Sequence, residues 1–245
     1  MWTTKNYNKS DKIFRGAYNY YRNDNIYAEE NFDVYFEKKE NSYITVAESL
    51  ARVATGEMLS IKVEYVVNKE YIPTYVSIEK NMGKEFAKEV FKYVTKRNHI
   101  LYSFDNSEGF HHEEEIITAP RYHIATPLTS PSMLFLKSKK LDVSGKNSFN
   151  VLSTMNQWDF KDSPVFKNII VERANLTTEK MNIDGQNVQA TQLKLYDGEA
   201  DFKNVKEPPH IRVFLSQHGA IPYVLRSDDG TKIQIKYFNN LNKDE

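Results

Sequence analysis

Apolar and polar residues alternate along most of this chain, and a repeat of two is typical of β-strands. The longest strict alternation places Leu59, Ile61, Val63, Tyr65 and Val67 on one side of a strand. Alternation of this kind puts one side of a strand in an apolar core and the other in water. About a dozen segments follow the same rule, which predicts a protein built mostly of strands.

The clearest group of strands lies near the C-terminus, where three alternating runs are separated by two turns. Asp229-Gly230 is a strong hairpin signal, because glycine accepts the positive φ that a tight turn requires. We therefore expect a three-stranded antiparallel meander with one buried face. Its strands are expected at 211–215, 221–225 and 233–237, with turns at 217–219 and 228–230.

Two segments have a different pattern. In the first, 84–97, Phe86, Val90 and Val94 recur every four residues as on a helix, yet aromatic and β-branched residues and neighbouring hairpins favour a strand. We predict a strand there. In the second, Ser130-Pro131 is typical of a helix start, because serine caps free amides and proline is tolerated in the first turn.

The helix expected after Ser130-Pro131 covers 132–140 and buries the apolar residues Met133, Leu134 and Leu136. The fold class is therefore mostly β: a single strongly curved antiparallel sheet or open barrel, with one short helix against its concave face. We expect one domain over residues 13–240, because no linker composition interrupts the strands, and a disordered N-terminus over 1–12.

The amino-acid composition excludes several classes of function. The 245 residues contain 33 basic and 33 acidic side chains, so the basic excess of a nucleic-acid binder is missing. The chain contains no cysteine, which excludes disulfides and thiol catalysis. No segment has the roughly 18 apolar residues of a transmembrane helix. The N-terminus lacks the apolar core of a signal peptide, so the protein is either cytoplasmic or the mature form of an exported chain.

Aromatic residues are abundant, with 16 Tyr and 14 Phe. They suit strands, and they also suit an apolar ligand groove. Tyr122, Phe149 and Trp158, with Met133 of the expected helix, are the candidate ligand-binding residues. The alternative is that these side chains belong to an ordinary core.

The densest group of titratable residues is His111-His112-Glu113-Glu114-Glu115. On a strand His111 and Glu113 share one side, and His123 follows after a turn. These three residues are a candidate site for a divalent metal, used by a β-barrel hydrolase, cyclase or isomerase. A solvated edge strand that discourages aggregation explains the same residues. Neither a Gly-x-Ser-x-Gly elbow nor a dinucleotide fingerprint is present, and we expect no cofactor.

Several short motifs resemble a family of bacterial envelope proteins of unknown function. They are Pro127-Leu128, Ser130 and Met133–Leu136 in mid-chain, then Leu215-Ser216, Ile221-Pro222 and Asp229-Gly230. The resemblance implies a curved sheet wrapped round a helix or groove, similar to the half-barrels that cradle lipids or lipoproteins. It implies a periplasmic or cell-envelope location and no established enzymatic activity.

These observations favour a non-catalytic binding protein that holds an apolar or lipid-like molecule, or contacts an envelope protein, on an aromatic-lined concave face. The His/Glu enzyme is the alternative.

Overall fold

The computed structural model describes residue 7 and residues 11–119, 121–139, 145–175, 177–183, 185–199, 209–216 and 221–241. Strands dominate it, with one α-helical turn, α1 (Thr129–Ser132), that continues into a 3-10 helix, η2 (Met133–Lys137). The strands are β1 (Lys12–Arg22), β2 (Asn25–Glu37), β3 (Ser42–Arg52), β4 (Met58–Asn68), β5 (Pro73–Met82), β6 (Glu85–Val94), β7 (His99–Asn106), β8 (His111–Ile117), β9 (Tyr122–Ile124), β10 (Lys146–Ser153), β11 (Val165–Arg173), β12 (Glu179–Ile183), β13 (Gln186–Asp197), β14 (Ile211–Ser216), β15 (Pro222–Ser227) and β16 (Thr231–Asn240).

The described strands form one sheet that does not close. Its order is β8-β7-β6-β5-β4-β3-β2-β1-β16-β15-β14-β13-β11-β10-β9, and β12 pairs with β13. The first and last strands, β1 and β16, are neighbours in the middle of the sheet. All pairs are antiparallel except β9 with β10, which are parallel, so the sheet is mixed.

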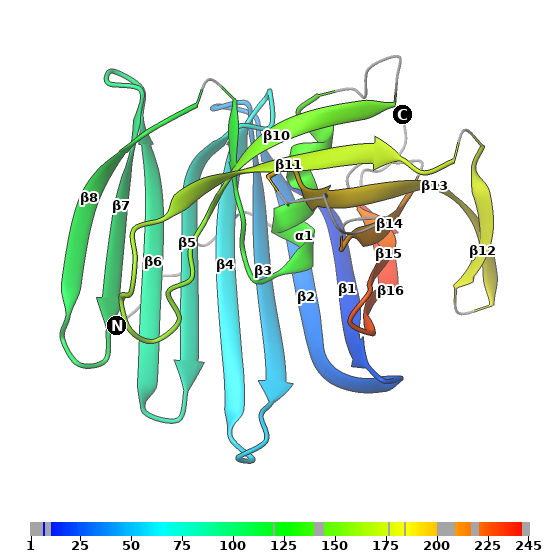
Figure 1. Ribbon diagram of the computed structural model, residues 1–245, viewed down its shortest axis with the longest axis horizontal. Helices are drawn as coiled ribbons and strands as arrows, with labels where there is room; N and C mark the ends of the chain where they lie inside the picture. The colour runs from blue at the N-terminus through cyan, green and yellow to red at the C-terminus, as the bar shows by residue number, and fades with distance from the viewer. Residues whose placement is uncertain are drawn as a thin grey trace.

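The sheet folds back over itself (Figure 1). Strands β1 to β8 stand next to one another, while β10, β11 and β13 run across them with α1 between the two layers. The predicted fold class is confirmed: a strongly curved, mostly antiparallel sheet holds one short helix against its concave side.

Two apolar cores result from this folding. The larger, which we call the inner core, lies on the concave face and includes Tyr18, Val67, Ile78, Phe91 and Tyr102. The second core lies on the other face of the later strands and consists of Phe135, Phe149, Val151, Val171, Leu193, Leu195, Val213 and Leu225.

The C-terminal meander exists as β14, β15 and β16, and its 228–230 turn is confirmed. The single buried face expected for it is wrong. Phe214 and Val224 enter the inner core, whereas their chain neighbours Val213 and Leu225 enter the second core. Both faces are covered because the later strands lie between the two cores. The turn expected at 217–219 lies outside the described residues.

The ambiguous segment 84–97 forms the strand β6, as predicted. The helix expected at 132–140 begins earlier, at Thr129, and ends earlier, at Lys137, with Ser138 at its C-cap position. Ser130 does not cap it: the N-cap position is Leu128, which makes no side-chain capping bond. Lys140 lies outside the described residues.

Glu30 of β2 provides the missing cap. Its side chain is fully buried, and its carboxylate oxygens accept hydrogen bonds from the main-chain amides of Thr129 at 2.8 Å and Ser130 at 2.9 Å. The hydroxyl of Tyr20 donates to the same carboxylate. Amides at a helix start need such acceptors, so a residue about a hundred positions earlier in the chain fixes α1 to the concave face.

Of the N-terminal segment 1–12, the structure describes Tyr7, Asp11 and Lys12. Tyr7 donates a hydrogen bond to Glu64, and Lys12 is the first residue of β1. In the described part of the chain, no helix has the length and apolar character needed to cross a membrane.

Candidate functional site

A pocket opens between η2 and the later strands. Its volume is about 600 Å³. We call it the η2 pocket; its apolar lining consists of Ala125, Met133, Phe135, Val151, Met155, Ile169, Leu195, Pro209 and Ile211.

The alternation of side chains along the strands decides which residues line this pocket. Val151 of β10, Ile169 of β11 and Leu195 of β13 point to the face that carries the second core. Met133 and Phe135 of η2 pack onto that face, whereas Leu134 points into the inner core. The short 3-10 helix therefore divides its apolar side chains between two cores, and the pocket lies beside its second-core side.

The polar residues of the η2 pocket come mainly from strand ends and turns. They are Thr126, Ser132, Ser153, Lys167, Tyr196, Asp197, His210, Ser227, Asp228 and Asp229. The main-chain amide of Thr231 donates to Asp229 and lowers the pKa of that carboxyl, so Asp229 is ionised at neutral pH. The pocket thus combines an apolar wall with a few polar and charged groups, which is typical of small-molecule sites.

His210 is the buried titratable residue of the pocket. Arg212 Nε donates to His210 Nε2 at 3.1 Å, which leaves the proton of the neutral ring on Nδ1. That nitrogen lies 3.5 Å from Asp228 Oδ2, which also accepts the main-chain amide of His210 at 3.2 Å. With contacts at both ring nitrogens, the imidazole of His210 is held in place as part of the pocket wall.

The four candidate ligand residues do not form one set. Met133 lines the η2 pocket, whereas Phe149 does not, although its ring lies 5.0 Å from that of the lining residue Phe135. Tyr122 belongs to the inner core and donates to the carbonyl of Pro73 at 2.6 Å. Trp158 packs against the inner core, and its carbonyl accepts from Asn106 at 3.1 Å.

The three candidate metal ligands are not brought together either. His111 is exposed on β8, where its Nδ1 lies 2.7 Å from Asp105 and its Nε2 lies 3.5 Å from Glu113. His123 is buried in β9, and its ring contacts those of Phe135 and Phe149. In the part of the chain that the structure describes, no group of three or more His, Asp or Glu side chains is arranged to hold a metal ion.

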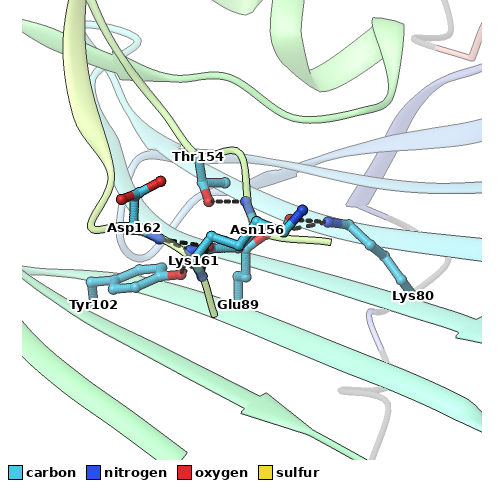
Figure 2. Close-up of polar contacts among 7 residues, drawn as sticks. All are labelled: Lys80, Glu89, Tyr102, Thr154, Asn156, Lys161 and Asp162. Carbon is cyan, nitrogen blue, oxygen red and sulfur yellow. Dashed lines mark hydrogen bonds and ion pairs between the residues drawn. The ribbon is translucent and has the colours of Figure 1, made fainter. Parts of the chain in front are cut away.

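Charged residues inside the concave face were missed by the sequence analysis. Glu30 stands between the inward residues Ala28 and Phe32, and Glu89 stands between Ala87 and Phe91. A carboxylate at an inward position of a regular alternation was the available signal, since an isolated buried charge is costly. Figure 2 shows the partners of Glu89, which are Tyr102 and Lys80, and the loop whose Asn156 contacts both of these residues.

The comparisons with known proteins concern the fold. No protein-family model and no curated protein matches the sequence. A β-barrel-like protein of the domain of unknown function DUF1849 from Brucella abortus has a TM-score of 0.52 and 9% identity, over 93% of this chain and 97% of that chain. A DUF1089 family protein from Pseudomonas aeruginosa has a TM-score of 0.48 and 8% identity, over 92% of this chain and 95% of that chain. The chain thus has a fold similar to that of the β-barrel-like DUF1849 protein.

Proposed function

We propose that this protein is a non-catalytic binding protein and that it holds an apolar or lipid-like molecule in the η2 pocket. The pocket itself is the observation that carries the proposal. A volume of about 600 Å³ lies within the range of small-molecule sites. Its wall is formed by aliphatic side chains, Met133 and Phe135, so an apolar chain or ring gains free energy by leaving water there.

Pocket filling tests the proposal. Ile169 lines the wall, and Ile169→Trp places a larger ring in the space that a ligand would occupy. We expect an environment-sensitive apolar fluorophore, such as an anilinonaphthalene sulfonate, to bind the unaltered protein and to bind Ile169→Trp at least about tenfold more weakly, a difference of about 1.4 kcal/mol.

The matched control is Val165→Trp. Val165 begins the same strand, lies outside the pocket and is already exposed. Circular dichroism should show that both variants are folded, and Val165→Trp should bind the fluorophore as the unaltered protein does. Equal binding by Ile169→Trp, or no binding by the unaltered protein, would contradict the proposal.

The natural ligand and the location belong to the same proposal. Native mass spectrometry of protein purified from its source should detect a bound apolar molecule. The resemblance to envelope proteins leads us to propose a periplasmic or envelope location. Cell fractionation tests this, and recovery of the protein with cytoplasmic markers would remove that part of the proposal without affecting the pocket.

A further inference from the structure

A lysine, a glutamate and a tyrosine meet on the concave face, on strands that do not line the η2 pocket. Lys80, Glu89 and Tyr102 stand on the neighbouring strands β5, β6 and β7, with their side chains on the inward side. The segment between β10 and β11 lies over them and brings in Asn156 (Figure 2). Glu89 is 1% exposed, Tyr102 is 0% exposed and Asn156 is 2% exposed, so water is largely excluded.

The side-chain amide of Asn156 is held and polarised. Its Oδ1 accepts from the main-chain amides of Lys161 at 2.7 Å and Asp162 at 3.2 Å. Its Nδ2 donates to the hydroxyl of Tyr102 at 3.1 Å and to the carbonyl of Asp162 at 2.8 Å. Two N–H donors on a carbonyl oxygen stabilise the negative charge that would develop there during nucleophilic attack at Cγ.

An amine stands beside the main chain of Asn156, and a carboxylate stands beside the amine. Lys80 Nζ lies 2.8 Å from the main-chain oxygen of Asn156 and 3.5 Å from Glu89 Oε2. The other oxygen of Glu89, Oε1, accepts from the hydroxyl of Tyr102 at 2.9 Å. Glu89 therefore connects the amine of Lys80 to the hydroxyl of Tyr102, which in turn contacts Nδ2 of Asn156.

We propose that Lys80 and Asn156 react to form an intramolecular isopeptide bond. Glu89 accepts a proton from the Lys80 ammonium, and the free amine attacks Cγ of Asn156. The bond between Lys80 Nζ and Cγ forms, and the bond between Cγ and Nδ2 breaks. The amine gives up two protons in all: one reaches the leaving nitrogen through Glu89 and Tyr102, and the other leaves with the ammonia as ammonium. No oxidant, metal or second substrate is required.

The position of the bond gives it a structural use. The segment that carries Asn156 joins β10 to β11, and Lys80 belongs to β5, so the bond would fasten the crossing layer to the first layer of the folded sheet. The chain contains no cysteine, so disulfides cannot supply such a cross-link. The aromatic residues around the site, including Tyr102, Phe91 and Phe104, keep it dry.

Mass spectrometry of the folded, unaltered protein decides the question. We expect an intact mass lower than that of the sequence by one molecule of ammonia, and a branched peptide in which a fragment containing Lys80 is joined to one containing Asn156. A full intact mass, with Lys80 and Asn156 recovered on separate unmodified peptides, would overturn the proposal. Because this measurement uses the natural sequence, it does not depend on a variant that folds.

Variants separate cross-linking from other losses of ammonia, such as cyclisation of Asn156 with its own backbone. Lys80→Arg should restore the full mass if the bond is to Lys80, and a persisting loss would overturn the proposal. Glu89→Gln keeps the shape but removes the base, so we expect the cross-link to be lost. The matched control is Lys88→Arg: Lys88 pairs with Glu79 at 2.9 Å between the same two strands, and this variant should keep the cross-link.

Discussion

His123 is the residue whose surroundings change its chemistry most clearly. Ser138 Oγ donates to the carbonyl of Phe135 at 2.7 Å, so the 3.1 Å contact between Ser138 and His123 Nε2 makes that nitrogen the donor. The other ring nitrogen, Nδ1, is buried without a hydrogen-bond partner among the described residues. Burial lowers the pKa of His123 from 6.5 to about 4, which is why a residue expected to bind a metal instead acts as part of an aromatic core.

This environment predicts a pH dependence of stability. The unfolded imidazole binds a proton near pH 6.5, whereas the folded one binds it only near pH 4. The free energy of unfolding should therefore be independent of His123 above pH 6.5 and should fall as the pH drops toward 4, by about 3 kcal/mol in total. In His123→Phe, the decrease in unfolding free energy that His123 causes between pH 6.5 and pH 4 should disappear. Urea unfolding at a series of pH values measures this.

His111→Gln is the control for that measurement. His111 is exposed and lies beside Asp105, which raises the pKa of the imidazole. Replacing His111 should leave unchanged the decrease in unfolding free energy that His123 causes below pH 6.5. Identical pH profiles for His123→Phe and the unaltered protein would contradict the assignment.

At the scale of single elements, the strands lie where the alternation of apolar and polar residues predicts them. The helix does not start at the capping residue that its own sequence offers, Ser130. Val63 and Ile78 point inward on β4 and β5 because a side chain on a pleated strand alternates between two faces. The start of α1 is instead decided by Glu30, whose carboxylate reaches the Thr129 and Ser130 amides from β2. A capping residue from a distant strand leaves no local pattern in the sequence.

The short 3-10 helix should contribute to stability through its inward side chain. Leu134 is buried in the inner core, so Leu134→Ala should lower the free energy of unfolding by about 2–5 kcal/mol through lost burial and the cavity left behind. Met155→Ala is the comparison, because Met155 is 71% exposed, and its change should stay within about 0.5 kcal/mol. Chemical denaturation measures both, and equal effects would contradict the placement of η2.

The edge strand β8 exposes an apolar residue at its end. Ile117 is 75% exposed, and in the described sheet β8 pairs only with β7. Exposed edges promote association between sheets, and charged residues oppose it. Ile117→Lys should therefore reduce light scattering at high protein concentration, with a change in unfolding free energy within about 0.5 kcal/mol. Ile116→Lys should instead lower the melting temperature, because Ile116 packs against the inner core.

At the scale of the whole molecule, the two cores share strands. Val213 and Phe214 are adjacent on β14 and enter different cores, as do Val224 and Leu225 on β15. Separate folding of either core would leave one face of these strands exposed. The chain is therefore expected to unfold as one cooperative unit.

Paired core variants test this cooperativity. Ile78→Ala alters the inner core and Leu193→Ala alters the second core, and each should cost about 2–5 kcal/mol. Both variants should shift the same single transition when fluorescence and circular dichroism are followed together. Two transitions, each moved by only one of the variants, would show that the cores unfold independently.

The sequence by itself determined most of the strands, including β6, because alternation between core and water is a local property that each segment carries. It also placed an apolar helix against a curved sheet. Only the tertiary structure decided which groups meet. Glu30 with the start of α1, His123 with Phe135 and Phe149, and Asn156 with Lys80 are all contacts between distant segments, set by how the sheet folds over itself. A periodic pattern reports which face of a strand is buried, but not which other strand will cover it.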